Sequence, residues 1–454
     1  MAFTLNHTLS ACGKKYTFNI GGSGCEKKVS RDPTILNKDN ITIYCYGQDS
    51  IAVSKLPDQL LLSLADGHGQ KENGREISYK IHEYLLSYMA EVKDFFIEYL
   101  RDNNYDAIKN IVVDMFRHVD NVILNQDEVT SKFKDGGTTF TLIQKIIDPM
   151  NGNLYTLSYN VGDSPYFKIS RNNGEIDIDE ISENQNCDNI KCVEDYANMC
   201  VKMGVNPYPV ILGRFNTERG FKAPWMGDDV IKPYIFELVN GKYILSVDSN
   251  IMKQFYENAP EDLKVNSLYN GGTQSIRDRK ANIKELSNGK YPVENFGSTL
   301  AGVLQTPQSF GDKHSKHKYH TICVPHVSIQ KYKSKDNSYD LVSSDGAIDC
   351  LTNEELSRLF NYKITNNVPM SEFLEFLENS IDIQASLGGF RFTKDTHIPT
   401  WDDLSYWVVE TTFEEDLNYK ISKLEQEYEL LYKLAEQIKI DIQVSNEALD
   451  TLTL

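Results

Sequence analysis

Apolar residues in the first third of the chain follow two different spacings. Residues 41–46 and 50–53 alternate or cluster as β-strands do, and residues 59–65 form an apolar run typical of a buried strand. From residue 78 to about residue 125, apolar residues recur with the spacing of one helix face. This order predicts the opening strands of a sheet, followed by two long amphipathic helices.

Strand spacing returns after the predicted helices. Residues 138–147 and 153–161 are joined by the turn sequence Asp148-Pro149-Met150-Asn151-Gly152, which predicts a hairpin. Shorter strand patterns occupy residues 166–170, 234–237 and 243–247. Strands, then helices, then hairpin-linked strands indicate a layered α+β fold.

Two parts of the chain differ from this core. Residues 207–296 lack sustained periodicity apart from the last two strand patterns, so we interpret much of this stretch as an insertion. We expect an N-terminal segment (1–36), a main domain (37–412) and a C-terminal helix (413–454). The last of these has a heptad-like seam at Leu417, Ile421, Leu424, Tyr428, Leu431, Ala435, Ile438 and Ile442. Packing on its own domain and self-association as a coiled coil are both open for this helix.

Composition restricts the classes of function. The chain has 47 Lys plus Arg against 65 Asp plus Glu, a net charge of −18, and shows no segregated basic patch for a nucleic acid. The nearest candidate, residues 313–318, we interpret as a solvated loop. The 8 cysteines form no Cys-x-x-Cys pair, and no apolar stretch approaches the ~18 residues of a membrane span. We expect a cytoplasmic protein, or a virion protein if the source is a large virus, with neither nucleic acid nor membrane as partner.

Carboxylates adjoin apolar strands at several places. An isolated Asp-Gly pair indicates only a turn. Several carboxylates at strand ends, however, repel one another at one rim of a sheet unless cations neutralise them, and Mg²⁺ or Mn²⁺ prefers such oxygen ligands. The carboxylates in question are Asp49, Asp66, Asp163, Asp345, Asp402 and Asp403. They lead to the hypothesis of a two-metal site suited to phosphoryl chemistry.

Six short segments succeed one another between about residues 48 and 410. They are Asp66-Gly67-His68-Gly69, Gly137-Thr138-Thr139, Asn160-Val161-Gly162-Asp163-Ser164, Ser309-Phe310-Gly311-Asp312, Ser344-Asp345-Gly346-Ala347-Ile348-Asp349 and Asp402-Asp403-Leu404-Ser405. In this order they resemble the metal-dependent type-2C (PPM-type) serine/threonine protein phosphatases. The resemblance implies two packed antiparallel β-sheets flanked by helices, an α-β-β-α sandwich.

The resemblance also implies a set of metal ligands. Asp66 would bridge two Mg²⁺ or Mn²⁺ ions, and the carbonyl oxygen of Gly67 would bind one of them. Asp345 and Asp402 would complete the shell of the second ion. Asp163 would hold a third, weaker ion.

Catalytic roles follow from the same resemblance. His68 would protonate the leaving serine or threonine oxygen, and Asp49 would hold metal-bound water. Gln48, where the family has Glu, and Asp403 are further candidates for the metal centre or its surroundings. Tyr44 stands where the family has an arginine that grips the substrate phosphate, so a bidentate contact is lost.

Two functions are consistent with these residues. The first is metal-dependent hydrolysis of phosphoserine or phosphothreonine in a phosphoprotein substrate, which the retained carboxylates favour. The second is a catalytically weak or inactive pseudophosphatase that acts as a binding or structural module. Tyr44, Gln48 and Pro165, which replaces an arginine common after Gly-Asp-Ser in the family, favour the second.

Overall fold

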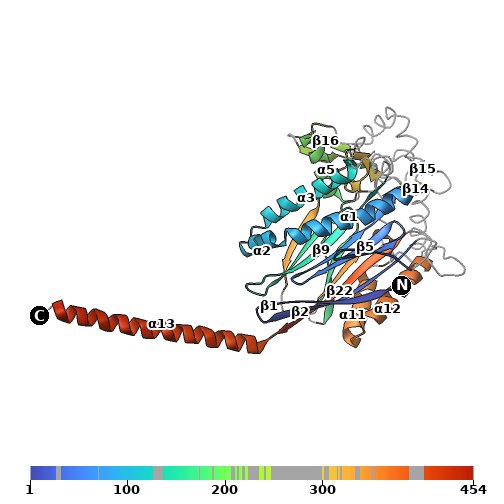
Figure 1. Cartoon of the computed structure of the whole chain (residues 1–454). Coiled ribbons are helices and arrows are strands. Elements are labelled where there is room, and N and C mark those ends of the chain that lie inside the picture. Colours follow the sequence, from blue (N-terminus) through green and yellow to red (C-terminus); the bar gives the residue numbers. More distant parts are fainter. Residues whose placement is uncertain are drawn as a thin grey trace.

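The computed structural model of the chain contains two large antiparallel sheets packed face to face between helices (Figure 1). The first two predicted strands, residues 41–46 and 50–53, correspond to β4 (Ile41–Tyr46) and β5 (Asp49–Leu56). The structure describes residues 2–26, 32–69, 71–125, 136–172, 174–186, 189–205, 210–211, 214–216, 220–222, 235–239, 242–246, 299–300, 306–313, 315–316, 320–332, 338–348, 351, 353–387 and 403–452.

The seven-stranded sheet has the order β20-β10-β9-β6-β5-β4-β3. Its side chains alternate between two cores, because successive residues of a strand point to opposite faces. In β6 (Gln59–Ala65), Leu61 faces the helices while Leu60 and Leu62 face the second sheet. The other strands are β3 (Thr34–Lys38), β9 (Phe140–Ile147), β10 (Leu154–Val161) and β20 (His326–Lys331). The predicted hairpin is present, with Leu154 opposite Ile147.

The six-stranded sheet has the order β1-β2-β22-β21-β11-β12. Its third strand, β22 (Leu404–Glu415), pairs with β2 (Lys14–Cys25) from Cys25↔Leu404 to Lys14↔Glu415. The remaining strands are β1 (Phe3–Ala11), β11 (Tyr166–Asn172), β12 (Glu175–Glu180) and β21 (Ser338–Ser343). Strands β1 and β2 thus come from the segment that we expected to precede the main domain.

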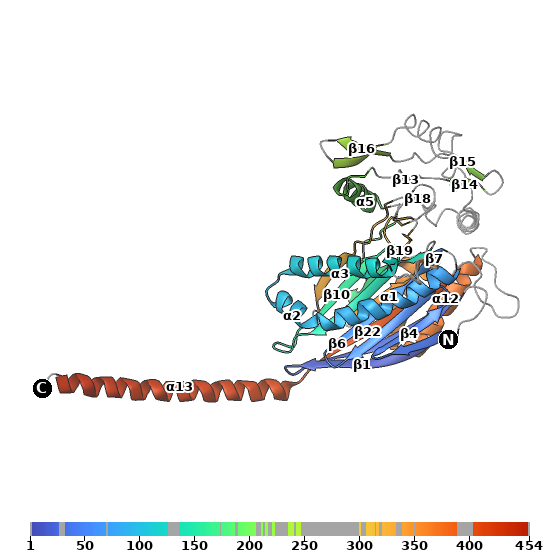
Figure 2. The ribbon, with the colours of Figure 1, turned by 45° about the horizontal axis from the view of Figure 1, so that its top comes forward.

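Helices cover both outer faces of the sandwich (Figures 1 and 2). The region predicted as two helices contains three, because the helix is interrupted at Val92 and the chain turns again at Asn103, which has a φ of 56°. These are α1 (Lys71–Glu91), α2 (Lys93–Arg101) and α3 (Tyr105–Asn125). On the other face lie α11 (Asn353–Asn366) and α12 (Met370–Leu387).

Three apolar layers hold the sandwich together. Ile81 and Phe116 belong to the layer between α1, α3 and the seven-stranded sheet, and Trp407 to the layer between the sheets. Phe360 and Phe373 belong to the layer between the six-stranded sheet and α11 and α12. The predicted α+β fold, two packed antiparallel sheets flanked by helices, is therefore confirmed.

Smaller elements complete the structure. A three-stranded sheet combines β7 (Gly67–Gly69), β8 (Gly136–Thr138) and β19 (Phe310–Gly311). Helix α5 is Ile190–Lys202. Within the predicted insertion, the two expected strands are β16 (Ile235–Val239) and β17 (Lys242–Ser246), which pair with each other. The short strands β13 (Val210–Ile211), β14 (Arg214–Asn216), β15 (Gly220–Lys222) and β18 (Thr299–Leu300) lie in or next to it, and the rest of the insertion is outside the described residues.

The C-terminal helix α13 (Leu417–Leu452) extends away from the sandwich, as both ribbon views show. None of the helices in the described part of the chain is long and apolar enough to cross a membrane.

Candidate metal centre and its surroundings

Asp66 lies where β6 ends and β7 begins. Its carbonyl oxygen accepts hydrogen bonds from the Thr139 amide at 2.9 Å and from Thr138 Oγ1 at 2.9 Å, which fix the turn in the backbone. The neighbouring strand β5 begins at Asp49, and Ser50 pairs with Ala65 across the two strands. Asp49 and Asp66 therefore stand at adjacent strand ends of one sheet edge.

Glycine is required at position 67 because two segments of backbone meet there. A Cβ atom on Gly67 would lie 2.6 Å from the carbonyl oxygens of both Gln48 and Gly74, closer than side chains tolerate. A Cβ on Gly74, in the first turns of α1, would lie 2.6 Å from the carbonyl oxygen of His68. The Asp-Gly-His-Gly sequence thus lets the start of α1 pack against the β4–β5 turn.

The β4–β5 turn is tied to the start of β22. The amide of Gln48 donates to Asp403 Oδ2 at 2.8 Å, and Ser405 Oγ donates to Asp49 Oδ2 at 3.0 Å. Ser78 Oγ of α1 holds the turn from the other side by donating to the Gln48 carbonyl oxygen at 2.6 Å. Asp49, at the start of β5, and Asp403, just before β22, are both buried.

Asp345 is brought to the same edge by a pair of serines. It opens the short helix α10 (Asp345–Ile348), directly after Ser344. The Ser344 amide donates to the Ser405 carbonyl oxygen at 2.9 Å, and the Ser405 amide donates to Ser344 Oγ at 3.0 Å. Because Ser405 also contacts Asp49, a continuous hydrogen-bonded path joins the segments of Asp49, Asp345 and Asp403.

Asp163 lies in a turn that Gly162 makes with a φ of 97°. Thr139, whose amide binds the Asp66 carbonyl, contacts Ser164 through its hydroxyl at 2.6 Å. The negative charge of Asp163 also raises the pKa of His68, although less than Asp312 does. The turn of Asp163 is therefore linked to the end of β6.

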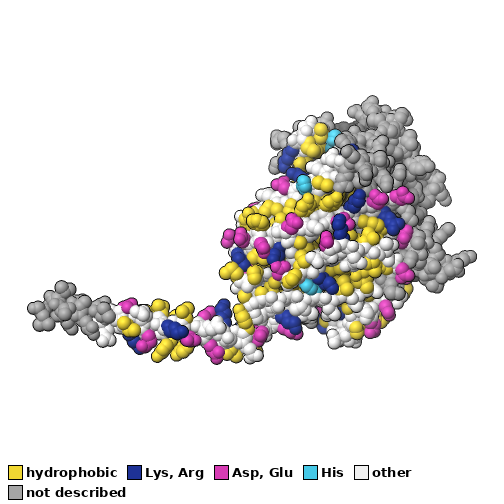
Figure 3. All heavy atoms as spheres, viewed as in Figure 1, with side chains coloured by type: hydrophobic (Ala, Val, Ile, Leu, Met, Phe, Trp, Pro, Cys, Tyr) yellow, Lys and Arg dark blue, Asp and Glu magenta, His cyan; other side chains and the backbone are white. Residues whose placement is uncertain are grey.

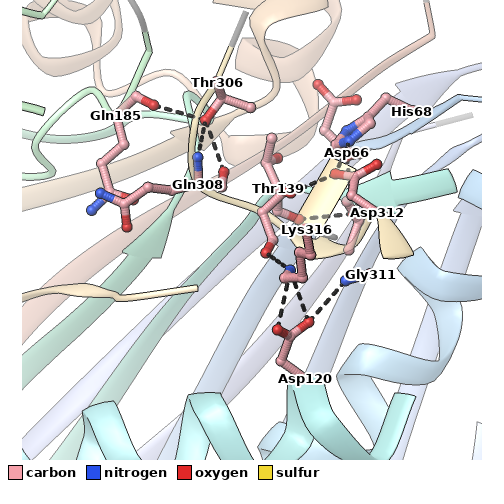
Figure 4. A network of polar contacts seen from close by, with 12 residues as sticks. Asp66, His68, Asp120, Thr139, Gln185, Thr306, Gln308, Gly311, Asp312 and Lys316 are labelled. Atoms are coloured by element: carbon pink, nitrogen blue, oxygen red, sulfur yellow. Dashed lines mark hydrogen bonds and ion pairs between the residues drawn. The ribbon is translucent and has the colours of Figure 1, made fainter. Parts of the chain in front are cut away.

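His68 contacts a carboxylate that we did not predict as part of the site. Its Nε2 lies 2.7 Å from Asp312 Oδ2, and Ser309 Oγ donates to the same oxygen at 2.5 Å (Figure 4). Burial lowers the pKa of His68, but the charge of Asp312 and its hydrogen bond reverse this effect, so the pKa is raised overall. Burial raises the pKa of Asp312, but His68 and Ser309 bring it below its ordinary value. The two groups form an ion pair.

A second buried ion pair supports the segment that carries Asp312. Lys316 Nζ lies 3.1 Å from Asp120 Oδ2 and donates to the Ser309 carbonyl oxygen at 2.7 Å, and the Gly311 amide donates to Asp120 Oδ1 at 3.0 Å (Figure 4). Lys316 is 12% exposed, so its interpretation as part of a solvated loop is wrong. Its partner Asp120 is far away in sequence on α3, so no local pattern indicated the pair. The only signal for Asp312 was its place in the Ser-Phe-Gly-Asp segment.

Tyr44 belongs to the packing between the sheets. It is buried, stacks on Phe3 with ring centroids 3.8 Å apart, and meets Trp407 edge to face. Burial raises the pKa of its hydroxyl. A core side chain therefore occupies position 44, where the sequence resemblance implied the loss of a phosphate-binding arginine.

The chemistry of the candidate side chains fits a hard divalent cation. Every acidic candidate offers carboxylate oxygens, and Gln48 Nε2 is buried without a hydrogen-bond acceptor in the structure. The Gln48 amide nitrogen can donate a hydrogen bond to a water near the site, but it cannot bind a cation directly. Among the described residues, no three His, Cys, Asp or Glu side chains are grouped as metal ligands would be. The predicted ligand Asp402 lies outside the described residues, so its placement stays a prediction.

The chain resembles several proteins of known structure. No family model and no curated protein matches the chain. The chain is similar to serine-threonine phosphatase 2C from Toxoplasma gondii, at 12% identity and a TM-score of 0.48 over 91% of this chain and 99% of that one. It is also similar to a C. elegans sex determining protein, at 14% identity and a TM-score of 0.41 over 86% of this chain and 64% of that one. A third likeness is the Mycobacterium tuberculosis serine/threonine phosphatase PstP, at 13% identity and a TM-score of 0.38 over 87% and 98%.

Proposed function

We propose that the protein is a metal-dependent phosphatase that hydrolyses phosphoserine or phosphothreonine in proteins. The observation that carries the proposal is the hydrogen-bonded path from Asp49 through Ser405 to the Asp345 turn, beside the sheet edge where Asp66 follows β6. Asp49 is buried, and Asp66 and Asp345 are half-buried. Carboxylates withdrawn from water repel one another unless they are paired or bound to cations, so a cation at this edge would stabilise them. The motif order and the oxygen donors support Mg²⁺ or Mn²⁺.

Each proposed ligand has a place in this scheme. Asp66 and the carbonyl oxygen of Gly67 would hold the first ion, Asp345 and Asp402 with Asp66 the second, and Asp163 a weaker third. When bound, such ions supply a nucleophile from water at neutral pH and neutralise the negative charge of the phosphoryl group.

His68 is the proposed proton donor to the leaving serine or threonine oxygen. Because its Nε2 faces Asp312, the proton that it can transfer is the one on Nδ1. The carboxylate of Asp312 stabilises the doubly protonated ring that carries this proton. Asp49 would orient water at the other side of the phosphoryl group, held in place by Ser405.

A pseudophosphatase is the second candidate, and one observation favours it. The Tyr44 ring is packed against Phe3 and Trp407, so no guanidinium grips the phosphate from that position. In this alternative the fold serves as a binding module, and the carboxylates bind cations without turnover.

The deciding experiment measures hydrolysis of an aryl phosphate and of a phosphoserine peptide by the purified chain, with and without Mn²⁺ or Mg²⁺. We expect turnover only with the metal, and we expect Asp66→Asn to reduce it by about 1,000-fold or more, because the bridging ligand is lost. The matched control is Asp114→Asn, which removes an exposed carboxylate from the middle of α3 and should leave turnover unchanged.

Three results would decide against the phosphatase. Turnover without any metal would contradict the metal mechanism, and equal turnover in Asp66→Asn would contradict the site. Absence of turnover together with Mn²⁺ binding by calorimetry would establish the pseudophosphatase instead.

A further inference from the structure

Helix α13 carries a row of large apolar side chains that the sandwich does not cover. The seven large residues of the row, at 50–72% exposure, are Leu417, Ile421, Leu424, Tyr428, Leu431, Ile438 and Ile442. The space-filling view shows apolar side chains along the projecting helix (Figure 3). At its base, the Tyr419 ring lies against Gly13 of the β1–β2 hairpin, at the end next to the body. Packing along its own domain therefore does not account for the row.

The row has the geometry of a coiled-coil seam. Alternating spacings of four and three residues assign Ile421, Tyr428, Ala435 and Ile442 to heptad position a and the other members to position d. An apolar hollow on the helix is lined by residues of the a, d, e and g positions, the set that forms the hole for a partner's side chain. The residues of this hollow are Ile421, Leu424, Glu425, Glu427, Tyr428 and Leu431.

Charged pairs lie mainly away from the seam. Lys433 contacts Glu429 at 2.9 Å, and these two residues occupy the outer positions f and b. Lys439, at position e, reaches outward to Glu436 at 2.7 Å. These pairs stabilise the single helix on the side that faces water, and they leave the apolar side for a partner.

We propose that the seam of α13 binds the same seam in a second copy of this chain. The apolar area of the seam is large enough for pairing with a second copy, since burying a large aliphatic side chain removes roughly 60–120 Å² of its surface from water. Six such residues and Tyr428 give roughly 400–850 Å² per helix, the upper end of which reaches the ~800 Å² per partner of a stable interface. Position e residue Tyr432 and position g residue Leu434 add to it.

Charge at the seam edges also suits self-association. In a parallel pair, the g residue Lys420 of one helix lies beside the e residue Glu425 of the other, and opposite charges attract there. The next edge contacts bring Glu427 beside Tyr432 and Leu434 beside Lys439, so no like charges meet. A seam of this kind is complementary to itself, as a two-fold symmetric interface requires.

The test is the molar mass of the full chain by light scattering over micromolar to tens of micromolar concentrations. We expect a mass of twice the chain or a higher whole multiple. The double variant Leu424→Asp with Leu431→Asp should return the mass to that of one chain. The matched control is Leu430→Asp, because Leu430 is as exposed as Leu431, at 69% against 64%, but lies at position c off the seam.

Several outcomes would overturn the proposal. A wild-type chain with the mass of one copy across this range would leave the seam to a different protein. A dimer that survives the double variant would place the contact elsewhere, and dissociation by Leu430→Asp to the same degree would contradict the seam. Thermal unfolding of the sandwich, which should be the same in all variants, distinguishes loss of the interface from loss of the fold.

Discussion

At the scale of single residues, the position of one ring nitrogen determines what His68 can do. Asp312 and Ser309 fix Nε2 on the inner side, with Asp312 itself held in a left-handed backbone conformation at a φ of 50°. A Cβ atom on Gly137 would lie 2.2 Å from the Asp312 carboxylate. Any larger residue at position 137 would therefore clash with this carboxylate. Asp312 is therefore a positioning residue for the proposed proton donor.

Asp312→Asn tests this role. We expect kcat for a phosphoserine peptide to fall by roughly 10- to 100-fold, a part of the ~100-fold or greater effect of a general acid, with little change in KM. The loss should be much smaller for p-nitrophenyl phosphate, whose leaving group needs little protonation. Steady-state kinetics on both substrates measure the difference.

A structural role alone would give a different result for Asp312. In that case both substrates would lose activity equally and the midpoint of thermal unfolding would fall. Ser309→Ala is the control, because it removes one hydrogen bond to Asp312 but keeps the carboxylate beside His68, and it should have a small effect on both substrates.

At the scale of elements, the three-stranded sheet of β7, β8 and β19 joins three of the motifs of the proposed site. Gly67 pairs with Thr138 and Phe310 with Thr138 from the other side, so three motifs of the sequence meet in one small sheet. The packing of α1 against the β4–β5 turn depends on this arrangement.

Gly67→Ala should disrupt the arrangement. The added Cβ would lie 2.6 Å from two backbone carbonyl oxygens, which cannot move as a side chain could. We expect a loss of about 1–3 kcal/mol in the free energy of unfolding by urea, together with loss of metal-dependent turnover. Gly204→Ala is the control, since its Cβ meets no atom within 4 Å but its φ is 72°; it should cost about 1–2 kcal/mol and keep full turnover. Full turnover in Gly67→Ala would contradict the predicted coupling.

The elements were predictable where alternation or helical spacing continued without interruption. Strands β4, β5, β6, β9 and β10 and the helix α13 were found from their apolar patterns. Strand β2 was missed because its second half, with Gly21, Gly22 and Gly24, reads as a loop although side chains of other elements fill the space beside these glycines. Pairing partners such as Asp312 with His68 were not predictable, because no local pattern records which distant residues a fold brings together.

At the scale of the whole molecule, a buried histidine on α1 is hydrogen-bonded to the seven-stranded sheet, at a strand that is itself bonded to the second sheet. His82 Nδ1 accepts from Ser63 Oγ at 2.7 Å, and its Nε2 donates to Ser50 Oγ, which donates onward to the Ser78 carbonyl oxygen. Trp407 of the second sheet donates to the Ser63 carbonyl oxygen at 2.9 Å. With one ring nitrogen donating and the other accepting, the imidazole of His82 is hydrogen-bonded in its neutral form. Burial lowers its pKa to about 3.

This network predicts that stability falls with acid. The unfolded chain takes up a proton on His82 below its ordinary pKa of 6.5, whereas the folded chain does so only near 3. The folded state is therefore penalised progressively as the pH falls through this window, by about 2 kcal/mol between about pH 7 and about pH 5. Urea unfolding at the two pH values should show a loss that is smaller by this amount in His82→Gln. His118→Gln, which removes an exposed histidine from α3, should keep the full loss, and an equal loss in all three proteins would contradict the prediction.

The position of β22 in the six-stranded sheet has a consequence for synthesis of the protein. β22 lies between β2, made near the start of translation, and β21, and it carries the Ser405 that contacts Asp49. Until residues 404–415 have left the ribosome, strand β2 of the nascent chain lacks its neighbouring strand β22. The Asp49 carboxylate lacks its hydrogen-bond donor Ser405 until then. The edge that carries the proposed site can therefore assemble only after translation has passed this strand, and nascent chains must remain unaggregated with an open sheet edge until then.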